Sequence, residues 1–398
     1  QGYSSAASDV YKRQRFGRRI PYLFVGSLVA VLVMCLLPNA GSFGMAVSTA
    51  MIFGLVSLMF LDTSINMAMQ PFKMMVGDMV NEKQKGLAYS IQSFLCNAGS
   101  LVGFLFPFIF TWIGISNIAP QGVVPDSVIY SFYIGAAILI LCVIYTTVKV
   151  KEMPPAEYAE YHGITEEEKK EKINMVKLLV KAPKAFWTVG LVQFFCWFAF
   201  MFMWTYTNGS VAANVFDAPT VETVVNGASK IVLDTKSIQY QNAADWVGVL
   251  FAVQAIGSVL WAVCIPMFKN RKLIYSLSLV LGGIGFISTY FVHNQYVLFI
   301  SFLLIGCAWA AMLALPFTIL TNALSGGHMG TYLGLFNGTI CIPQIVAATL
   351  GGSILALFTP KGMLPPEINM LVMAGVMLII GAVCVYLIKE TKGEQAKA

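Results

Sequence analysis

One carboxylate, Asp62, stands within the apolar segment LMFLDTSINMAMQPF, residues 58–72, and the next charge along the chain is Lys73. A charge held at this depth in a membrane helix costs about 3 kcal/mol or more, so such residues usually have a task. Removal of a carboxyl group from water favours its protonated form. Asp62 is therefore the leading candidate for binding a coupling cation, and a polar contact with a neighbouring helix is the alternative.

Amide side chains follow Asp62 along the same helix, with Asn66 four residues later and Gln70 four beyond that. Residues four apart lie on one side of a helix, so these side chains form a polar stripe that we expect to face a cavity. Sugar binding needs hydrogen bonds to hydroxyl groups and flat apolar faces for the ring. The candidate substrate-binding residues are Asn66, Gln70, Gln92, Asn97, Gln193, Trp197, Asn208, Trp309, Asn337 and Gln344. For the aromatic residues, a place in the interfacial belt of a membrane protein is the alternative.

The composition is that of a membrane protein. Hydrophobic residues make up 58% of the chain and charged residues 11%, with a mean hydropathy of +0.74. Soluble domains carry about 25% charged residues, so this chain has too few to cover a surface in water. The eight cysteines fall within apolar segments and form no CxxC motif, which favours small buried side chains over disulfides or metal ligands. We find no nucleotide-binding loop, zinc motif or nucleophile–base set, and therefore expect neither an enzyme nor a resident metal or cofactor.

Apolar runs long enough to cross a bilayer occur about ten times. The predicted spans are 21–37, 44–72, 87–112, 128–148, 185–212, 246–268, 273–292, 296–322, 331–358 and 368–388. With the N-terminus in the cytoplasm, all but Lys230, Lys236 and Lys361 of the 25 basic residues fall on the cytoplasmic side. This asymmetry predicts that both termini are cytoplasmic. The same loops account for the net charge of +6, so nucleic-acid binding is not expected.

Two polar segments interrupt the spans, one at 149–184 and one at about 213–245. The first predicts a solvated, partly helical cytoplasmic linker, and the second lies outside the membrane on the other side. The segments QPFKMMVGDMVNEKQKG, 70–86, and LPFTILTNALSGGHMG, 315–330, both contain Pro-Phe, then a polar residue and then Gly, and the interval from Asp78 to Gly86 equals that from Asn322 to Gly330. They indicate parallel repeats in which the first half lacks its opening two helices.

These segments resemble the major facilitator superfamily, a twelve-helix carrier fold. RFGRRIPY, residues 15–22, resembles its loop between helices two and three, and LDTSINMAMQPFKMMVGD, 61–78, is similar to helix four of the sucrose-type sugar symporters. The segments 193–204, 306–320 and 330–352 resemble helices seven, ten and eleven. The likeness extends from Arg15 onward and is nearest to bacterial members associated with maltose and related disaccharides.

The resemblance implies an all-α membrane protein with helices 3–12 present. Residues 1–14 match nothing in the family and resemble translated adapter sequence, so we exclude them from the fold. The expected parts are a truncated N-terminal bundle at 15–148, the linker at 149–184, a six-helix C-terminal bundle at 185–390 and a tail at 391–398. Acidic residues of the plant sucrose carriers are replaced here by Thr207 and Gly209, and an arginine is absent around Trp246. These departures weaken the transfer of the plant chemistry.

The function implied by the resemblance is proton-coupled symport of a disaccharide or related glycoside by alternating access. We expect a monomer in the inner membrane of a bacterium, with lipid, sugar and proton as its partners. Arginine forks pair with carboxylates across helix ends, and the expected cytoplasmic gate consists of Arg15, Gly17, Arg18, Arg19, Lys73 and Asp78. Sodium coupling, a different solute, or a sugar sensor that does not transport remain as alternatives.

Overall fold

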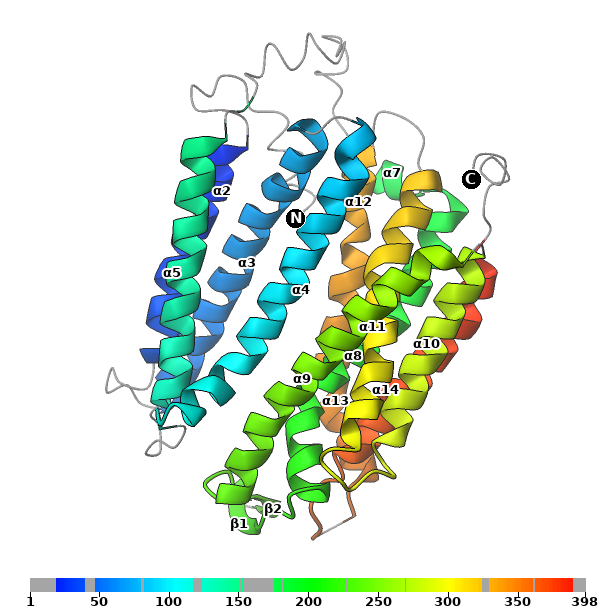
Figure 1. Cartoon of the computed structure of the whole chain (residues 1–398). Helices are drawn as coiled ribbons and strands as arrows, with labels where there is room; N and C mark the ends of the chain where they lie inside the picture. Colours follow the sequence, from blue (N-terminus) through cyan, green and yellow to red (C-terminus); the bar gives the residue numbers. More distant parts are fainter. Residues whose placement is uncertain are drawn as a thin grey trace. The chain divides into compact units, whose positions relative to one another are not determined.

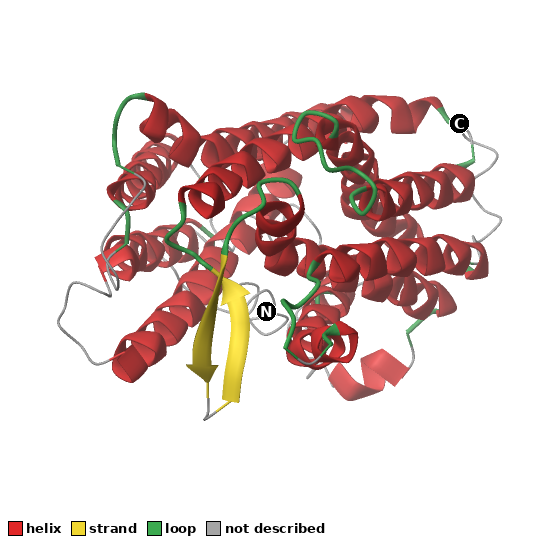
Figure 2. Cartoon of the chain, turned by 90° about the horizontal axis from the view of Figure 1, so that it is seen from below, coloured by secondary structure: helices red, strands yellow, loops and turns green. Residues whose placement is uncertain are grey.

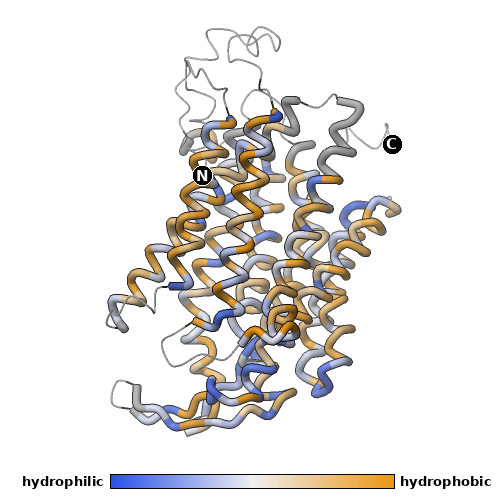
Figure 3. The backbone as a smooth tube through the Cα atoms, turned by 60° about the vertical axis from the view of Figure 1, so that its left-hand side comes forward, coloured by the Kyte–Doolittle hydropathy of each residue, from blue (hydrophilic) through white to orange (hydrophobic). Residues whose placement is uncertain are grey.

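The computed structural model describes residues 19–39, 47–79, 82–116, 124–150, 152, 175–180, 182–225, 228–268, 270–323, 329–360 and 362–388. Within this part of the chain, ten helices are long and apolar enough to cross a membrane. The predicted number of spans and the helical membrane class are therefore confirmed. Figure 3 shows apolar residues dominating the helices, with polar residues gathered toward their ends.

The chain divides into two compact units, one of residues 1–96 and 109–178, the other of 97–108 and 179–398. The long helices of the first unit are α2 (Ile20–Leu36), α3 (Val47–Met79), α5 (Asp126–Lys149) and the two ends of α4 (Glu82–Trp112). Helix α2 packs against both α3 and α5 (Figure 1). Gly26 permits the close approach of α2 to α3, because a Cβ atom there would lie 2.9 Å from the carbonyl oxygen of Ser64.

The second unit is a bundle around α8. Its elements are α8 (Lys184–Asn214), α9 (Ile238–Cys264), η2 (Ile265–Met267), α10 (Arg271–Ser288), α11 (Leu298–Ala323), α12 (Met329–Phe336), α13 (Gly338–Phe358), α14 (Ile368–Cys384) and η3 (Val385–Leu387), with the middle of α4. Helix α8 contacts α9, α11, α13 and α14 and is buried along most of its length. A short helix, α7 (Met175–Val180), lies in the predicted linker.

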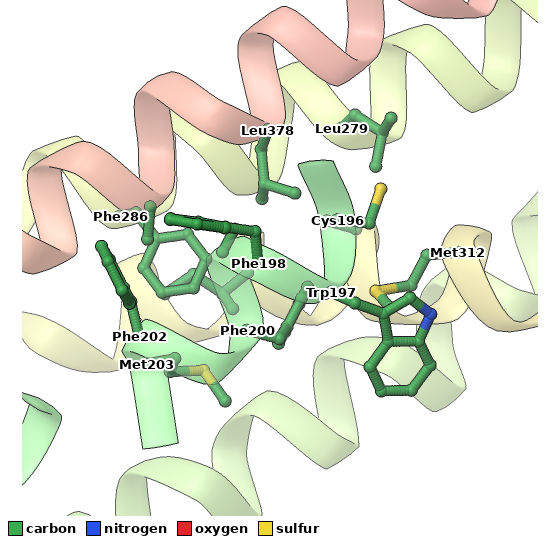
Figure 4. Close-up of a cluster of buried hydrophobic side chains, with 14 of the residues drawn as sticks. Cys196, Trp197, Phe198, Phe200, Phe202, Met203, Leu279, Phe286, Met312 and Leu378 are labelled. Atoms are coloured by element: carbon green, nitrogen blue, oxygen red, sulfur yellow. The ribbon is translucent and has the colours of Figure 1, made fainter. Parts of the chain in front are cut away.

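Aromatic side chains fill the core of this bundle. Phe186, Phe200, Phe202, Phe286 and Phe302 are almost completely buried. On α8, the Phe198 ring packs against Phe202 with centroids 4.7 Å apart, and the Phe200 ring packs edge to face against Phe286 of α10 at 5.8 Å (Figure 4). Residues that are apolar all round a helix are expected where the helix is surrounded by other helices, and the buried position of α8 agrees with this.

The polar insertion before α9 contains a β-hairpin that the sequence did not predict. Strands β1 (Thr220–Val225) and β2 (Ala228–Leu233) pair antiparallel, with Thr220 opposite Leu233 and Val225 opposite Ala228 (Figure 2). Helix α9 also begins earlier than the expected residue 246. Ser237 caps it by accepting a hydrogen bond from the backbone N–H of Tyr240 at 3.3 Å, so a polar turn extends the apolar span.

The ninth predicted span, 331–358, is interrupted at Asn337, between α12 and α13. Pro343 lies further along, inside α13. Glycines 334 and 338 flank this break, and glycine lowers the cost of departing from helical geometry.

Candidate functional site

Five side chains form a stripe along one face of α8, at intervals of three or four residues. They are Gln193, Trp197, Phe200, Trp204 and Asn208. At about 100° per residue, they fall within about 80° around the helix axis. Three of them belong to the predicted substrate-binding set, so the helix places a polar group at each end of an aromatic surface.

Gln193 lies at one end of the α8 stripe, fully buried. Its Nε2 donates a hydrogen bond to the backbone carbonyl of Met312 on α11 at 3.0 Å. Its Oε1 is buried and accepts no hydrogen bond within the part of the chain that the structure describes. An unsatisfied buried acceptor costs about 1–3 kcal/mol, so this oxygen is suited to accept a hydrogen bond from a ligand hydroxyl.

Three indole rings meet beside Gln193. Trp197 contacts Trp309 of α11 edge to face with ring centroids 5.8 Å apart, and Trp204 contacts Trp309 at 5.8 Å. Figure 4 shows the Trp197 ring beside Met312. Trp197 is 8% exposed and its Nε1 lacks a hydrogen-bond acceptor among the described residues, whereas Trp204 is 40% exposed. Gln193, Trp197 and Trp309 thus lie where α8 meets α11. The indole surface is apolar, the Trp197 N–H is a hydrogen-bond donor, and the Gln193 Oε1 is an acceptor.

Asn208 lies at the other end of the α8 stripe and belongs to a second polar group. Its Nδ2 donates to the hydroxyl of Tyr240 at 2.9 Å. Glu367, at the N-cap of α14, packs directly against Gly209. Burial raises the pKa of Glu367 to about 7. Glu367 was not among the residues predicted from the sequence, although a single acid before the last apolar run was a signal for it.

The remaining polar candidates of the C-terminal half are part-buried. Asn337 is the N-cap of α13, and Gln344 lies within that helix. Helix α13 packs on α8, where the Thr339 methyl group approaches Gly190. Both residues therefore belong to the part of the chain that begins or forms α13, the helix that adjoins α8. Among the described residues, no contact joins their side chains to the indole rings of Trp197, Trp204 and Trp309.

In the first unit, Asp62 is exposed on α3. Ser64 and Ala68 lie on the side of α3 that packs against Gly26 of α2, and Asp62 lies about 200° around the helix from Ser64. Asn66 Nδ2 donates to the backbone carbonyl of Asp62 at 2.9 Å, so these residues occupy one turn. No ion pair or hydrogen bond to the Asp62 carboxylate occurs within the described ranges.

The other amide candidates of the first half are less closely defined. The backbone of Gln70 lies in α3, and its side chain is outside the described part of the structure. Gln92 is part-buried on α4, and Asn97, also part-buried on α4, belongs to the second unit. The predicted continuation of the Asp62 and Asn66 stripe to Gln70 remains a prediction.

Most predicted gate residues lie outside the described part. This holds for Arg15, Gly17 and Arg18, and for the side chains of Lys73 and Asp78 in α3.

Arg19 is described and is 4% exposed. Its backbone N–H and that of Ile20 donate to Oε2 of Glu152 at 2.8 and 3.2 Å. Glu152, which was not among the predicted residues, thus caps the start of α2 from beyond the end of α5. An anion at this end of a helix also complements the helix dipole.

A family model described as the Major Facilitator Superfamily matches residues 11–233 and 211–398. The chain belongs to the major facilitator superfamily. The two matched stretches together extend over nearly the whole chain, in agreement with the family expected from the helix-four and gate motifs.

Solved structures share the fold of this superfamily member. A D-xylose–proton symporter aligns with a TM-score of 0.67 at 14% identity, covering 99% of this chain and 88% of that chain. The xylose transporter XylE from E. coli, inward open, gives 0.62 at 12% identity, covering 99% and 84%. FucP in the outward conformation gives 0.57 at 13% identity, covering 96% and 86%. A search of curated proteins finds no match. At these identities the similarity establishes the fold of an integral membrane transporter.

Proposed function

We propose that this protein is a proton-coupled symporter of a disaccharide or related glycoside. The observation that carries the proposal is the group formed by Gln193, Trp197 and Trp309, in which a buried amide oxygen and a buried indole N–H both lack partners among the described residues. Binding sites for small molecules combine an apolar surface with a few placed polar groups, and this group has that composition.

The sugar-binding surface of the proposal lies on the second unit. Indole faces suit the apolar C–H face of a pyranose ring, and the amides of Gln193 and Asn208 suit its hydroxyl groups. Because Gln193 is fully buried and Trp197 nearly so, a sugar reaches them only after α8 and α11 separate locally. Such rearrangement is expected of a carrier that works by alternating access.

The coupling step of the proposal uses Asp62 on the first unit. A proton from the aqueous phase binds the carboxylate. The neutral carboxylic acid can then enter apolar surroundings, which strongly disfavour the charged form. Release of the proton on the other side restores the charge. Asp62 is exposed and is the only charged residue of α3 before Lys73, which supports this role, because a proton must reach the group.

The choice of substrate rests on the helix-four motif and on the similarity of the fold to solved transporters. Two of the neighbouring structures are titled as xylose transporters, one of them a proton symporter. They support the sugar and proton classes, and the preference for a disaccharide comes from the sequence motif of residues 61–78.

Uptake into proteoliposomes tests the proposal. We expect purified protein to accumulate labelled maltose or sucrose when the outer solution is acidic, and to exchange sugar without a gradient. Asp62→Asn should abolish accumulation while exchange persists. Asp126→Asn, which removes an exposed carboxyl group at the start of α5, is the matched control and should leave accumulation unchanged. Accumulation driven by a sodium gradient instead, or binding of the sugar without exchange, would contradict proton-coupled symport.

A further inference from the structure

A carboxyl group that the proposed mechanism does not use lies at the junction of α8 and α14. Glu367 is the N-cap residue of α14, just outside the span Ile368–Leu387, and makes no capping hydrogen bond through its side chain. Its carboxylate lies against Gly209 of α8 so closely that a methyl group at position 209 would overlap it. The absence of a side chain at Gly209 is therefore what admits the carboxyl group.

The groups around Glu367 are hydroxyls, an amide and glycine backbone. Among the described residues, the titratable groups that face it are the phenols of Tyr206 on α8 and Tyr240 on α9. Tyr240 accepts a hydrogen bond from Asn208. The Tyr206 hydroxyl lies over α13, 2.6 Å from where a Cβ atom of Gly351 would stand. Groups of α8 and α9 thus face this carboxyl at the start of α14, and α13 adjoins one of them, Tyr206; within the described ranges no cation faces the carboxyl group.

An ionised carboxylate in these surroundings lacks the stabilisation that water or a cation would give. Withdrawal from water is the cause that raises the pKa of Glu367 to about 7, because burial disfavours the charged form. The Oδ1 of Asn208 is buried and lacks a donor among the described residues. A protonated carboxyl group would add a hydrogen-bond donor to a cluster in which an amide oxygen goes unpaired.

We propose that Glu367 is a second proton-binding site of this protein, and that its protonated carboxyl group holds the start of α14 against Gly209 of α8. The proton comes from the aqueous phase at the end of the bundle where α8 ends and α14 begins. When it leaves, the carboxylate requires hydration, and water entering at Gly209 separates the two helix ends. Protonation therefore closes this end of the second unit, and deprotonation opens it.

This inference does not depend on the sugar or on Asp62, and its test needs no transport. The purified full chain is titrated from about pH 5 to about pH 9 in detergent. Infrared difference spectra follow the carbonyl stretch of protonated carboxyl groups. Hydrogen exchange of the backbone amides of residues 206–214 and 368–374 reports how readily the junction of α8 and α14 opens. The exchange rates are corrected for the intrinsic effect of pH on exchange. We expect a carboxyl band that is lost near neutral pH, and exchange at the junction that rises several-fold over the same range.

Two variants and their controls make the test specific. Glu367→Gln should lose the band and hold exchange at a level that no longer depends on pH, whereas Glu222→Gln on the exposed hairpin should change neither. Gly209→Ala should displace the carboxyl into water and shift its titration to lower pH. Gly352→Ala, where a Cβ atom meets open space, is the matched control.

Three results would overturn the proposal. The first is a carboxyl band near neutral pH that survives Glu367→Gln, and the second is exchange at the junction that is independent of pH in the unmodified protein. The third is a response of the junction to sodium at fixed pH with none to protons, which would make the group a sodium site. Loss of sugar uptake alone bears on the proposed function and leaves this inference unaffected.

Discussion

Individual polar side chains of the second unit are buried with part of their hydrogen-bonding capacity unused. Gln193 bonds through Nε2 but not through Oε1, and Trp197 buries an indole N–H without an acceptor among the described residues. Most buried polar groups in native proteins are paired, so unpaired ones call for an explanation. Here a ligand that supplies hydroxyl groups accounts for both, since each hydroxyl can donate and accept.

Removal of the Trp197 N–H should affect sugar binding more than folding. Trp197→Phe deletes a donor that has no acceptor among the described residues, so we expect the KM for the sugar to rise roughly tenfold, corresponding to one hydrogen bond. Trp246→Phe is the matched control, because that indole donates to the Gln295 carbonyl at 3.2 Å. The control should lower the Tm and leave KM unchanged. Equal effects of the two variants on KM would argue against a sugar-binding role for Trp197.

The raised pKa of Glu367 has a consequence for stability. Its value rises from 4.5 to about 7 on folding, so between these limits the folded protein holds a proton that the unfolded chain has released. The free energy of unfolding therefore falls as pH rises from about 4.5 to about 7 and levels off above this range. Thermal unfolding in detergent, with Glu367→Gln as the comparison, should show that the variant lacks this component. An identical pH profile for both proteins would contradict the assignment.

At the scale of helices, the second unit relies on close backbone approach between α9 and α11. A Cβ atom at Gly257 would lie 2.6 Å from the carbonyl oxygen of Leu303, and Gly306 faces the backbone of Gln254 as closely. In a bilayer, where burial of apolar surface gives no advantage over lipid contact, small residues that allow such packing are a main source of helix association.

Adding a methyl group at this contact should force the helices apart. We expect Gly257→Ala to lower stability by about 1–3 kcal/mol, as for overpacking in general, and to lower the Tm in detergent accordingly. Gly54→Ala on α3 is the control, because the added Cβ atom there meets nothing within 4 Å. A Gly257→Ala variant as stable as the control would show that α9 and α11 adjust without cost.

The start of α2 depends on a carboxylate from a distant part of the chain. Glu152 accepts hydrogen bonds from the N–H groups of Arg19 and Ile20, 133 and 132 residues away. Glu152→Ala removes this cap and should cost about 1 kcal/mol. Hydrogen exchange should accelerate at residues 20–24 and remain unchanged in α10, and unaltered exchange at residues 20–24 would refute the cap.

For the whole molecule, the distribution of basic residues predicts the orientation in the membrane. Lys230 lies on the exposed hairpin and Arg271 at the exposed start of α10. In a variant without its native cysteines, Lys230→Cys should react with an impermeant maleimide added outside intact cells. Arg271→Cys should react only after permeabilisation. The reverse pattern would invert the topology.

The sequence predicted the helices well, because each span is a local apolar run whose length and composition suffice to identify it. It also drew attention to Gln193, Trp197 and Trp309, since polar and aromatic residues in apolar helices are uncommon enough to notice. It did not predict the break in the ninth span, which falls at Asn337 between α12 and α13. The hairpin was missed because its strands are short and their apolar residues are grouped, as in Val224–Val225 and Ile231–Leu233, so apolar and polar residues do not alternate.

By itself, then, the sequence determined the membrane class, the ten spans and the family, all of which are encoded in residues close together along the chain. Only the tertiary structure decided which distant groups meet. It placed the Glu152 carboxylate on the first turn of α2, the Gln193 amide against α11, and Glu367 on the bare backbone of Gly209. Such contacts depend on how helices pack and rotate against one another, and no local pattern of residues specifies that geometry.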